Sequence, residues 1–236
     1  MYICNRKKTI KKLWLSTQIW KSNCNIQKKN KGYKRVSPHL KNRHKRITDM
    51  NSFIETIKKF GNISESVESD ILKNIKTENK KKGHYLIKAG QSTANLFVLQ
   101  TGLVRGFYIK NDKEINTWFA SENIVLGSAL PLFSNHPSKE NIQLLEDSIF
   151  HYISNQNLQE LYKKYPDFNT IGRKIAEDYC LLLEDRIASL QVDSAEDRYR
   201  NLINDFPNIL QRVSLGHISS YLGITQATLS RIRGKV

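Results

Sequence analysis

The spacing of apolar residues changes twice along this chain, and this change constrains the fold more than any other feature. From Phe53 to Ile75 apolar residues recur at helical spacing, which predicts two short helices. Beyond His84 they form short aromatic and branched runs separated by turn residues, which is typical of an antiparallel β domain. These runs are residues 85–87, 96–99, 104–109, 115–119, 124–126, 142–145 and 149–153. The pattern predicts an α+β protein built on a β-roll of jelly-roll type.

A long amphipathic helix is predicted after Pro166. One apolar stripe runs from Ile171 to Leu190, and a second row at residues 180–182 widens it. A single neighbouring surface does not usually need so wide an apolar arc. We therefore interpret the helix as packed on two sides, one of them a second copy of the chain. The alternative is a helix buried only against its own β domain.

Two short helices joined by a glycine turn are predicted near the C-terminus. Ser214 is placed to cap the first helix, and Gly223 supplies the left-handed residue that ends it. Thr225 then caps a second helix, whose inner residues are Leu229 and Ile232. This arrangement is typical of a helix-turn-helix, whose second helix enters the major groove of DNA. The alternative is an ordinary helical hairpin with solvated arginines.

The outward face of the second helix carries side chains that can read DNA. Arg231 can form a bidentate pair with guanine, and Gln226 can pair with adenine. Arg233 lies nearer the flank, where a phosphate is the expected partner, and Ser214 with Thr225 can offer hydroxyls or helix N-terminal amides to the backbone. The predicted DNA-binding residues are Ser214, Thr225, Gln226, Ala227, Thr228, Ser230, Arg231 and Arg233.

At these residues the sequence resembles the Crp-Fnr family of bacterial transcription regulators, in particular its short, Bacteroidetes-type members. The resemblance extends over about residues 62–235 and is closest at 222–225 and 228–233. Upstream, residues 101–105, 113–115, 118–123 and 145–147 look like the family's sensor β-roll, and residues 195–199 look like the start of its DNA-binding domain. The resemblance implies a cyclic-nucleotide-binding-like β-roll that senses an effector, a long dimerisation helix and a C-terminal winged helix-turn-helix.

Four segments follow from these observations. They are a basic extension at residues 1–49, the β-roll with its flanking helices at 50–163, the dimerisation helix at 164–191 and the helix-turn-helix domain at 192–236. The chain stops at Val236, soon after the second helix, so we expect any wing strands to be absent or shortened.

The residues that hold the phosphate in cyclic-AMP-binding members are changed here. Those members use a Gly-Glu pair and an Arg followed by Ser or Thr; here Gly127 matches the glycine, but Ser128 replaces the Glu. Ser138 and Lys139 stand where the arginine is expected, and a lysine supplies only a flexible point charge. We therefore predict no bound cofactor and no cyclic-AMP binding. The effector is unknown, and control by abundance alone is the alternative.

Arg105 is the remaining candidate for an effector pocket. It lies in the middle of a predicted strand, where its side chain could point into the roll and meet an anionic effector. The alternative is an arginine paired with a nearby carboxylate on the outside of the roll. The candidate effector pocket is Arg105, Gly127, Ser128, Ser138 and Lys139.

Positive charge is concentrated at the N-terminus. The whole chain carries a net charge of +16, whereas residues 1–49 contain fifteen Lys or Arg residues and a single acid, Asp49. We expect this segment either to be an unfolded arm that attracts phosphates or to reflect a start upstream of the working start at Met50.

Other classes of protein are disfavoured. The three cysteines lie far apart without metal-ligand spacing, which predicts no metal site and fits a reducing, cytoplasmic compartment. No run approaches the roughly 20 apolar residues of a membrane-spanning helix. Without a nucleophile elbow or a glycine-rich phosphate loop, we predict no catalytic residues and no enzyme.

The prediction is therefore a homodimeric, sequence-specific transcription regulator. Its partners would be double-stranded DNA with a palindromic operator and a small-molecule effector. The alternative is a small-molecule-binding sensor that acts on a partner protein rather than on DNA.

Overall fold

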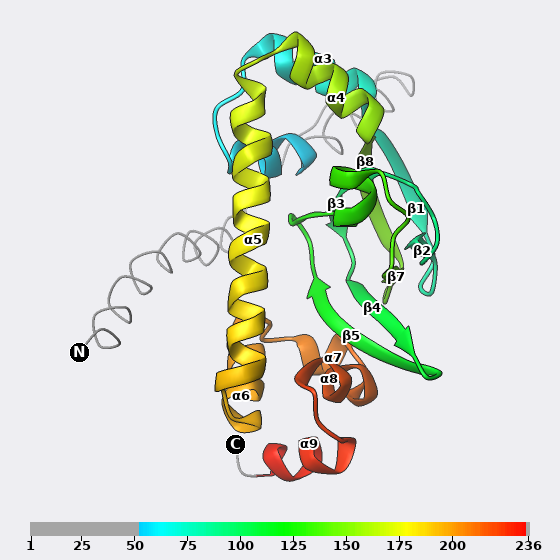
Figure 1. Ribbon diagram of the computed structural model, residues 1–236, viewed down its shortest axis with the longest axis vertical. Coiled ribbons are helices and arrows are strands. Elements are labelled where there is room, and N and C mark those ends of the chain that lie inside the picture. The colour runs from blue at the N-terminus through cyan, green and yellow to red at the C-terminus, as the bar shows by residue number, and fades with distance from the viewer. Residues whose placement is uncertain (1–51, 235–236) are drawn as a thin grey trace, which may run out of the picture. The chain divides into compact units, whose positions relative to one another are not determined.

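The computed structural model describes residues 52–234 (Figure 1). The predicted extension at residues 1–49 lies outside this range. Residues 52–58 are helical. The helices that follow are α3 (Glu65–Asn74), α4 (Asn155–Lys164), α5 (Phe168–Val192), α6 (Ala195–Asp205), α7 (Ile209–Arg212), α8 (Leu215–Leu222), α9 (Gln226–Arg233) and the single-turn π-helix η3 (Leu130–Ser134). The strands are β1 (Lys76–Lys80), β2 (Tyr85–Ile87), β3 (Asn95–Thr101), β4 (Val104–Lys110), β5 (Lys113–Ala120), β6 (Val125–Leu126), β7 (Asn141–Leu144) and β8 (Ser148–Ser154).

The strands form a roll of two four-stranded sheets. One has the order β1-β8-β3-β6 and the other β2-β7-β4-β5, and every pairing is antiparallel. Apolar side chains from both sheets meet between them, including Leu99 and Ile142, which are fully buried. The predicted α+β fold with an antiparallel β-roll is confirmed.

One strand was not predicted from the sequence. β1 consists entirely of polar residues and pairs with β8 in an unbroken register from Lys76↔Tyr152 to Lys80↔Ser148. It is the edge strand of its sheet, and most of its side chains are exposed. A strand in this position needs no apolar alternation, so periodicity does not reveal it.

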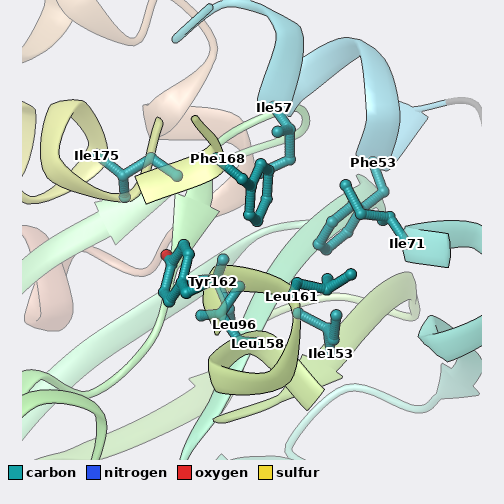
Figure 2. A pocket seen from close by; sticks show the side chains of 10 residues that line it. All are labelled: Phe53, Ile57, Ile71, Leu96, Ile153, Leu158, Leu161, Tyr162, Phe168 and Ile175. Carbon is teal, nitrogen blue, oxygen red and sulfur yellow. The ribbon is translucent and has the colours of Figure 1, made fainter. Parts of the chain in front are cut away.

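A second apolar core lies among the helices at one end of the roll. Side chains from residues 52–58, α3, α4 and the start of α5 converge there, among them Phe53, Ile71, Leu161 and Phe168. Figure 2 shows the small cavity that they enclose, whose volume is about 10 Å³. This is close to the space that one water molecule needs. The cavity therefore has no room for an effector.

The predicted long helix is observed as α5, which is 25 residues long. It begins at Phe168 because Pro166 follows the end of α4 and cannot continue that helix. Only Phe168 and Ile171 of α5 are buried. Further along, Leu183, Ile187 and Leu190 are 43%, 56% and 46% exposed. Most of the apolar surface of α5 is thus left uncovered by the rest of residues 52–234.

The C-terminal helices share a third core with the roll. Ile218, Leu222 and Leu229 are fully buried in this core, and Leu103 and Phe119 of the roll join it. The rings of Phe119 and Tyr221 lie 5.2 Å apart, measured between centroids. Helices α6–α9 therefore pack directly against the roll rather than forming a separate unit on a tether.

Candidate nucleic-acid interface

Local hydrogen bonds build the helix-turn-helix as its sequence predicts. Ser214 caps α8 by accepting a hydrogen bond from the backbone N–H of His217, with an N–O distance of 3.3 Å. α8 ends at Gly223, whose φ of 67° is left-handed and favours glycine. Thr225 then caps α9 by accepting from the N–H of Thr228 at 3.1 Å. These caps satisfy helix-end amides that would otherwise lack partners.

One face of α9 is buried and the other is open. Leu229 and Ile232 face the core at 0% and 7% exposure. Thr228 is partly buried and accepts a hydrogen bond from Arg231 Nη2 at 3.3 Å. The other predicted DNA-binding residues are all exposed, namely Ser214, Thr225, Gln226, Ala227, Ser230, Arg231 and Arg233. In the part of the chain that the structure describes, neither Arg231 nor Arg233 forms an ion pair. Both guanidinium groups are thus free to meet an anion.

The N-terminal ends of the two helices approach closely. A Cβ at Gly216 would lie 3.2 Å from Nε2 of Gln226, so a larger residue there would press on the Gln226 side chain. Gly216 therefore lets Gln226 lie against the first turn of α8. Ser214, which caps the N-terminal end of α8, therefore lies on the same side of the helix-turn-helix as Thr225 and Gln226, which begin α9.

The backbone of β5 is bonded to α8 by a single hydroxyl. Ser220 Oγ accepts from the N–H of Asn116 at 3.0 Å and donates to the carbonyl of Glu114 at 2.9 Å. β5 is an edge strand of its sheet, so these groups have no strand partner on that side. Helix α8 therefore covers the free edge of β5.

Arg105 holds the same helix from the neighbouring strand. Its side chain is 4% exposed and donates from Nη1 to Glu114 at 2.6 Å and to Nδ1 of His217 at 2.9 Å. Nε and Nη2 both donate to Oε1 of Gln143, at 3.0 and 2.7 Å. The hydrogen bond from Arg105 lowers the pKa of Glu114. Arg105 is thus directed at α8 and at a carboxylate. The sequence left two alternatives open for this side chain, and the structure has the pairing with a carboxylate rather than the orientation into the roll.

A second arginine fastens α7 to the roll. Nε and Nη2 of Arg212 donate to the two carboxylate oxygens of Glu146, at 2.9 and 2.7 Å, and Nη2 also donates to Glu122 at 2.8 Å. Burial raises the pKa of Glu122, but the hydrogen bonds from Arg212 and from the N–H of Gly102 outweigh it, and the pKa is lowered. Glu122 is therefore held ionised beside Arg212.

Long helix α5 also contacts the helix-turn-helix. The guanidinium carbon of Arg186 lies 3.8 Å from the centroid of the Tyr221 ring, and Nη2 donates to the carbonyl of Tyr221. From α6, Nε of Arg198 donates to the carbonyl of Leu222 at 3.0 Å. Two cations therefore lie at the C-terminal end of α8, where they interact favourably with the negative end of the helix dipole.

The candidate effector residues do not form one site. Ser128 and Ser138 are buried, with their hydroxyl oxygens 2.9 Å apart, and Ser138 also donates to the carbonyl of Glu140. Gly127, just before Ser128, is tightly packed, because a Cβ there would lie 2.6 Å from the side chain of Leu132. Lys139, in contrast, is exposed. Arg105 points to α8, so the five residues do not converge on a ligand.

A buried carboxyl group occupies this region instead. Glu140 is 7% exposed, and its Oε2 accepts a hydrogen bond from the indole N–H of Trp118 at 3.0 Å. Burial raises the pKa of Glu140. Among residues 52–234, no arginine is hydrogen-bonded to or ion-paired with this carboxyl group. Sequence reasoning missed Glu140; the available signal was an acid two residues before the apolar run at 142–145.

Residues 52–234 contain no group of three or more His, Cys, Asp and Glu side chains that could hold a metal ion. No helix in this range has both the length and the apolar character needed to cross a bilayer.

Comparison with known proteins agrees with this architecture. Residues 77–165 match the family described as cyclic nucleotide-binding domain. The fumarate and nitrate reduction regulatory protein of Escherichia coli K12 is 28% identical over an aligned length of 184 residues, and the match covers 71% of this chain and 72% of the relative.

Solved structures show the same fold at lower identity. FixK2 from Bradyrhizobium japonicum has a TM-score of 0.59 at 17% identity, over 68% of this chain and 83% of its own. The c-di-GMP-responsive regulator CLP from Xanthomonas campestris also has a TM-score of 0.59, at 16% identity over 73% and 91% of the two chains. CooA from Carboxydothermus hydrogenoformans has a TM-score of 0.55 at 20% identity, over 70% and 77%. With the β-roll and the C-terminal helix-turn-helix already in view, these solved structures share the fold of this chain, and its sequence is similar to a fumarate and nitrate reduction regulatory protein and, over residues 77–165, to the cyclic nucleotide-binding domain family.

Proposed function

We propose that this protein regulates transcription by binding a specific DNA sequence through α9. The observation that carries the proposal is the exposed polar face of α9, in which Arg231 and Arg233 have no acidic partner among the described residues. An arginine without an acidic partner on a helix capped and oriented in this way is suited to base edges and phosphates. The protein would act by binding rather than by catalysis.

The residues of α9 divide into two roles. Arg231 would pair with guanine and Gln226 with adenine, each pair contributing about 1 to 3 kcal/mol of discrimination. Arg233 is the last residue of α9, where it would contact a phosphate. Ser214 and Thr225, at the N-terminal ends of α8 and α9, would bind phosphates of the DNA backbone and so position the duplex.

The protein is proposed to act as a homodimer joined along α5. Leu183, Ile187 and Leu190 follow one another at helical spacing and are about half exposed in the single chain. A second copy of α5 would cover them. A twofold axis along this contact would place two α9 helices about one helical turn of DNA apart, roughly 34 Å, which favours a palindromic operator.

We propose that the roll does not take a cyclic nucleotide as its effector. Support comes from buried Glu140, from the Ser128–Ser138 hydrogen bond and from the orientation of Arg105 away from both. An effector of another kind, or a redox event, would act by changing how α5 and the roll hold the helix-turn-helix. Such a switch requires the effector to bind one geometry of the dimer more tightly than the other.

Selection of duplexes from genomic fragments, followed by titration against scrambled competitor at several salt concentrations, tests the proposal. A preference for a twofold-symmetric site is expected. Arg231→Ala should weaken that site about 5- to 150-fold, the equivalent of one lost base pair contact, and leave binding to random DNA nearly unchanged. Equal losses on both DNAs would refute base reading. Capture of a partner protein without any duplex preference would favour a sensor that acts on protein.

A further inference from the structure

The β4–β5 hairpin ends in two lysines that face each other. Lys110 and Lys113 are paired in register across a two-residue turn, in which Asn111 and Asp112 have φ values of 51° and 57°. Like charges directly opposite each other on neighbouring strands destabilise a hairpin. Both lysines are exposed, and across residues 52–234 neither one forms an ion pair or hydrogen bond. Asp112, in the turn between them, and Glu114, directly after Lys113, are the neighbouring acids in the sequence.

The hairpin is fixed relative to the DNA-binding helices. Ser220 of α8 bonds to the backbone of β5 at Glu114 and Asn116, immediately after Lys113. The carboxylate of Glu114 is drawn back toward Arg105, which also contacts His217 of α8. The tip therefore keeps its position beside the helix-turn-helix, and the carboxylate of the nearest acid on β5, Glu114, is already paired with Arg105.

An open groove connects the tip to the start of the recognition helix. Lys113, Glu114 and Ile115 line it from β5, Ser219 and Ser220 line it from α8, and Gly223, Ile224, Thr225 and Gln226 line it from the turn and the start of α9. Thr225 and Gln226 begin α9, so the positive end of the helix dipole faces the same groove as the ammonium group of Lys113. The two positive features are thus neighbours on one surface.

We propose that the hairpin tip is a second DNA-contacting element, in which Lys113 and Lys110 bind backbone phosphates next to the base pairs read by α9. This inference rests on the proposed function. A helix in the major groove, which is about 12 Å wide, has a phosphate backbone along each side. A cation placed beyond the N-terminal end of α9 meets one of these backbones. The two opposed lysines repel each other in the free protein, and a polyanion bound between them would relieve this repulsion.

The contact is electrostatic and carries no sequence information. Lysine binds phosphate as a flexible point charge, without the fixed geometry that base recognition needs. Neutralising the tip should therefore weaken binding to matched and scrambled duplexes alike. It should also make binding less sensitive to salt, because fewer counterions are released.

The test compares Lys110→Gln/Lys113→Gln with wild type and with Lys76→Gln in the full chain. Lys76 is also an exposed strand lysine, but it belongs to the other sheet. On the selected duplex, the slope of log K against log salt should fall by about 2 for the double variant, close to 0.9 for each lost phosphate contact, and stay unchanged for Lys76→Gln. The ratio of affinities for matched and scrambled DNA should stay the same, and Lys110→Arg/Lys113→Arg should recover the slope. Circular dichroism of the double variant should match wild type, because removing the like-charge pair does not weaken the hairpin.

Each other outcome has a distinct meaning. If wild type prefers its duplex but the glutamine variant keeps the wild-type slope, the hairpin contact is refuted and the proposed function stands. Tighter DNA binding by the glutamine variant also refutes it, because the tip would then hinder the duplex. A wild-type protein with no duplex preference at any salt would refute the proposed function itself.

Discussion

Nη1 of Arg105, on strand β4 of the roll, lies 2.9 Å from Nδ1 of His217, in the first turn of α8. A guanidinium group can only donate hydrogen bonds, so Nδ1 of His217 must accept and must be unprotonated. Glu114 completes the group, with Oε2 at 2.6 Å from Arg105 Nη1 and at 4.0 Å from His217 Nδ1. The roll and the DNA-binding helices are therefore joined by a contact that requires neutral histidine.

Acidification should weaken this contact. Burial and the charge of Arg105 lower the pKa of His217 from its ordinary value of 6.5, Lys82 acts in the same direction, and Glu114 opposes them. The unfolded chain therefore binds a proton more readily than the folded chain does. The stability due to neutral His217 is fully present above pH 6.5 and is lost as the pH falls through the lower folded pKa.

Urea unfolding from about pH 8 to pH 5 measures this effect. The free energy of unfolding of wild type should decline below pH 6.5 more steeply than that of His217→Gln, which cannot titrate. His136→Gln, at an exposed position, is the matched control and should follow wild type. Parallel curves for wild type and His217→Gln would contradict the prediction.

Replacing Arg105 should loosen the helix-turn-helix from the roll. Arg105→Met keeps much of the aliphatic volume but removes the hydrogen bonds to Glu114, Gln143 and His217. Since Glu114 is partly exposed, water can replace some of the lost interaction, and we expect a loss of about 1 to 3 kcal/mol.

Chemical denaturation measures the loss, and hydrogen exchange locates it. Amides of α8 and of β5 should exchange faster in Arg105→Met, whereas those of α3 and α4 should not. Arg173→Met, which removes an exposed ion pair with Glu177 on α5, should change stability by less than about 1 kcal/mol. Uniformly faster exchange across the chain would mean that Arg105 supports the roll as a whole.

Arg212 should not be replaceable by lysine. It joins Glu122 and Glu146 through a planar fork that a single ammonium group cannot reproduce. Because all three side chains retain some exposure, Arg212→Lys should cost only about 1 to 2 kcal/mol. Thermal unfolding measures it, with Arg200→Lys on the exposed side of α6 as the control. A loss in Arg200→Lys as large as that in Arg212→Lys would argue against a special role for the fork.

Charges on the open side of α5 should prevent dimerisation. Leu183→Glu/Ile187→Glu places two carboxylates where a second α5 would pack, while the single chain tolerates them because both positions are exposed. Sedimentation velocity should show a monomer for this variant and a dimer for wild type. Lys174→Glu, on a different face of α5, should remain dimeric. A dimeric Leu183→Glu/Ile187→Glu variant would place the dimer contact elsewhere.

Features that depend on neighbouring residues could be read from the sequence. Ser214, Gly223 and Thr225 act within one turn of their own helices, so their types and spacing predict the helix ends. Short apolar runs predict strands β2–β8 in the same way, whereas the polar strand β1 has no apolar pattern that would reveal it.

Contacts between distant polar residues could not be read. Arg105 and His217 are 112 residues apart, and Ser220 and Asn116 are 104 apart. No periodicity connects such pairs, because their proximity follows from how the C-terminal helices settle on the roll. For the same reason Glu140 and Trp118 were not recognised as partners. Whether the five candidate effector residues act together was equally open, and their positions in the fold argue against it.

The covering of β5 by α8 also limits how the protein can move. Ser220 occupies amide and carbonyl groups on the outer margin of a sheet. A large swing of the C-terminal helices would bare that margin, and a bare strand margin recruits strands from other molecules. In the proposed regulator, α8 would thus keep this sheet margin from pairing with strands of other molecules, and a signal would act through displacements small enough to leave β5 covered.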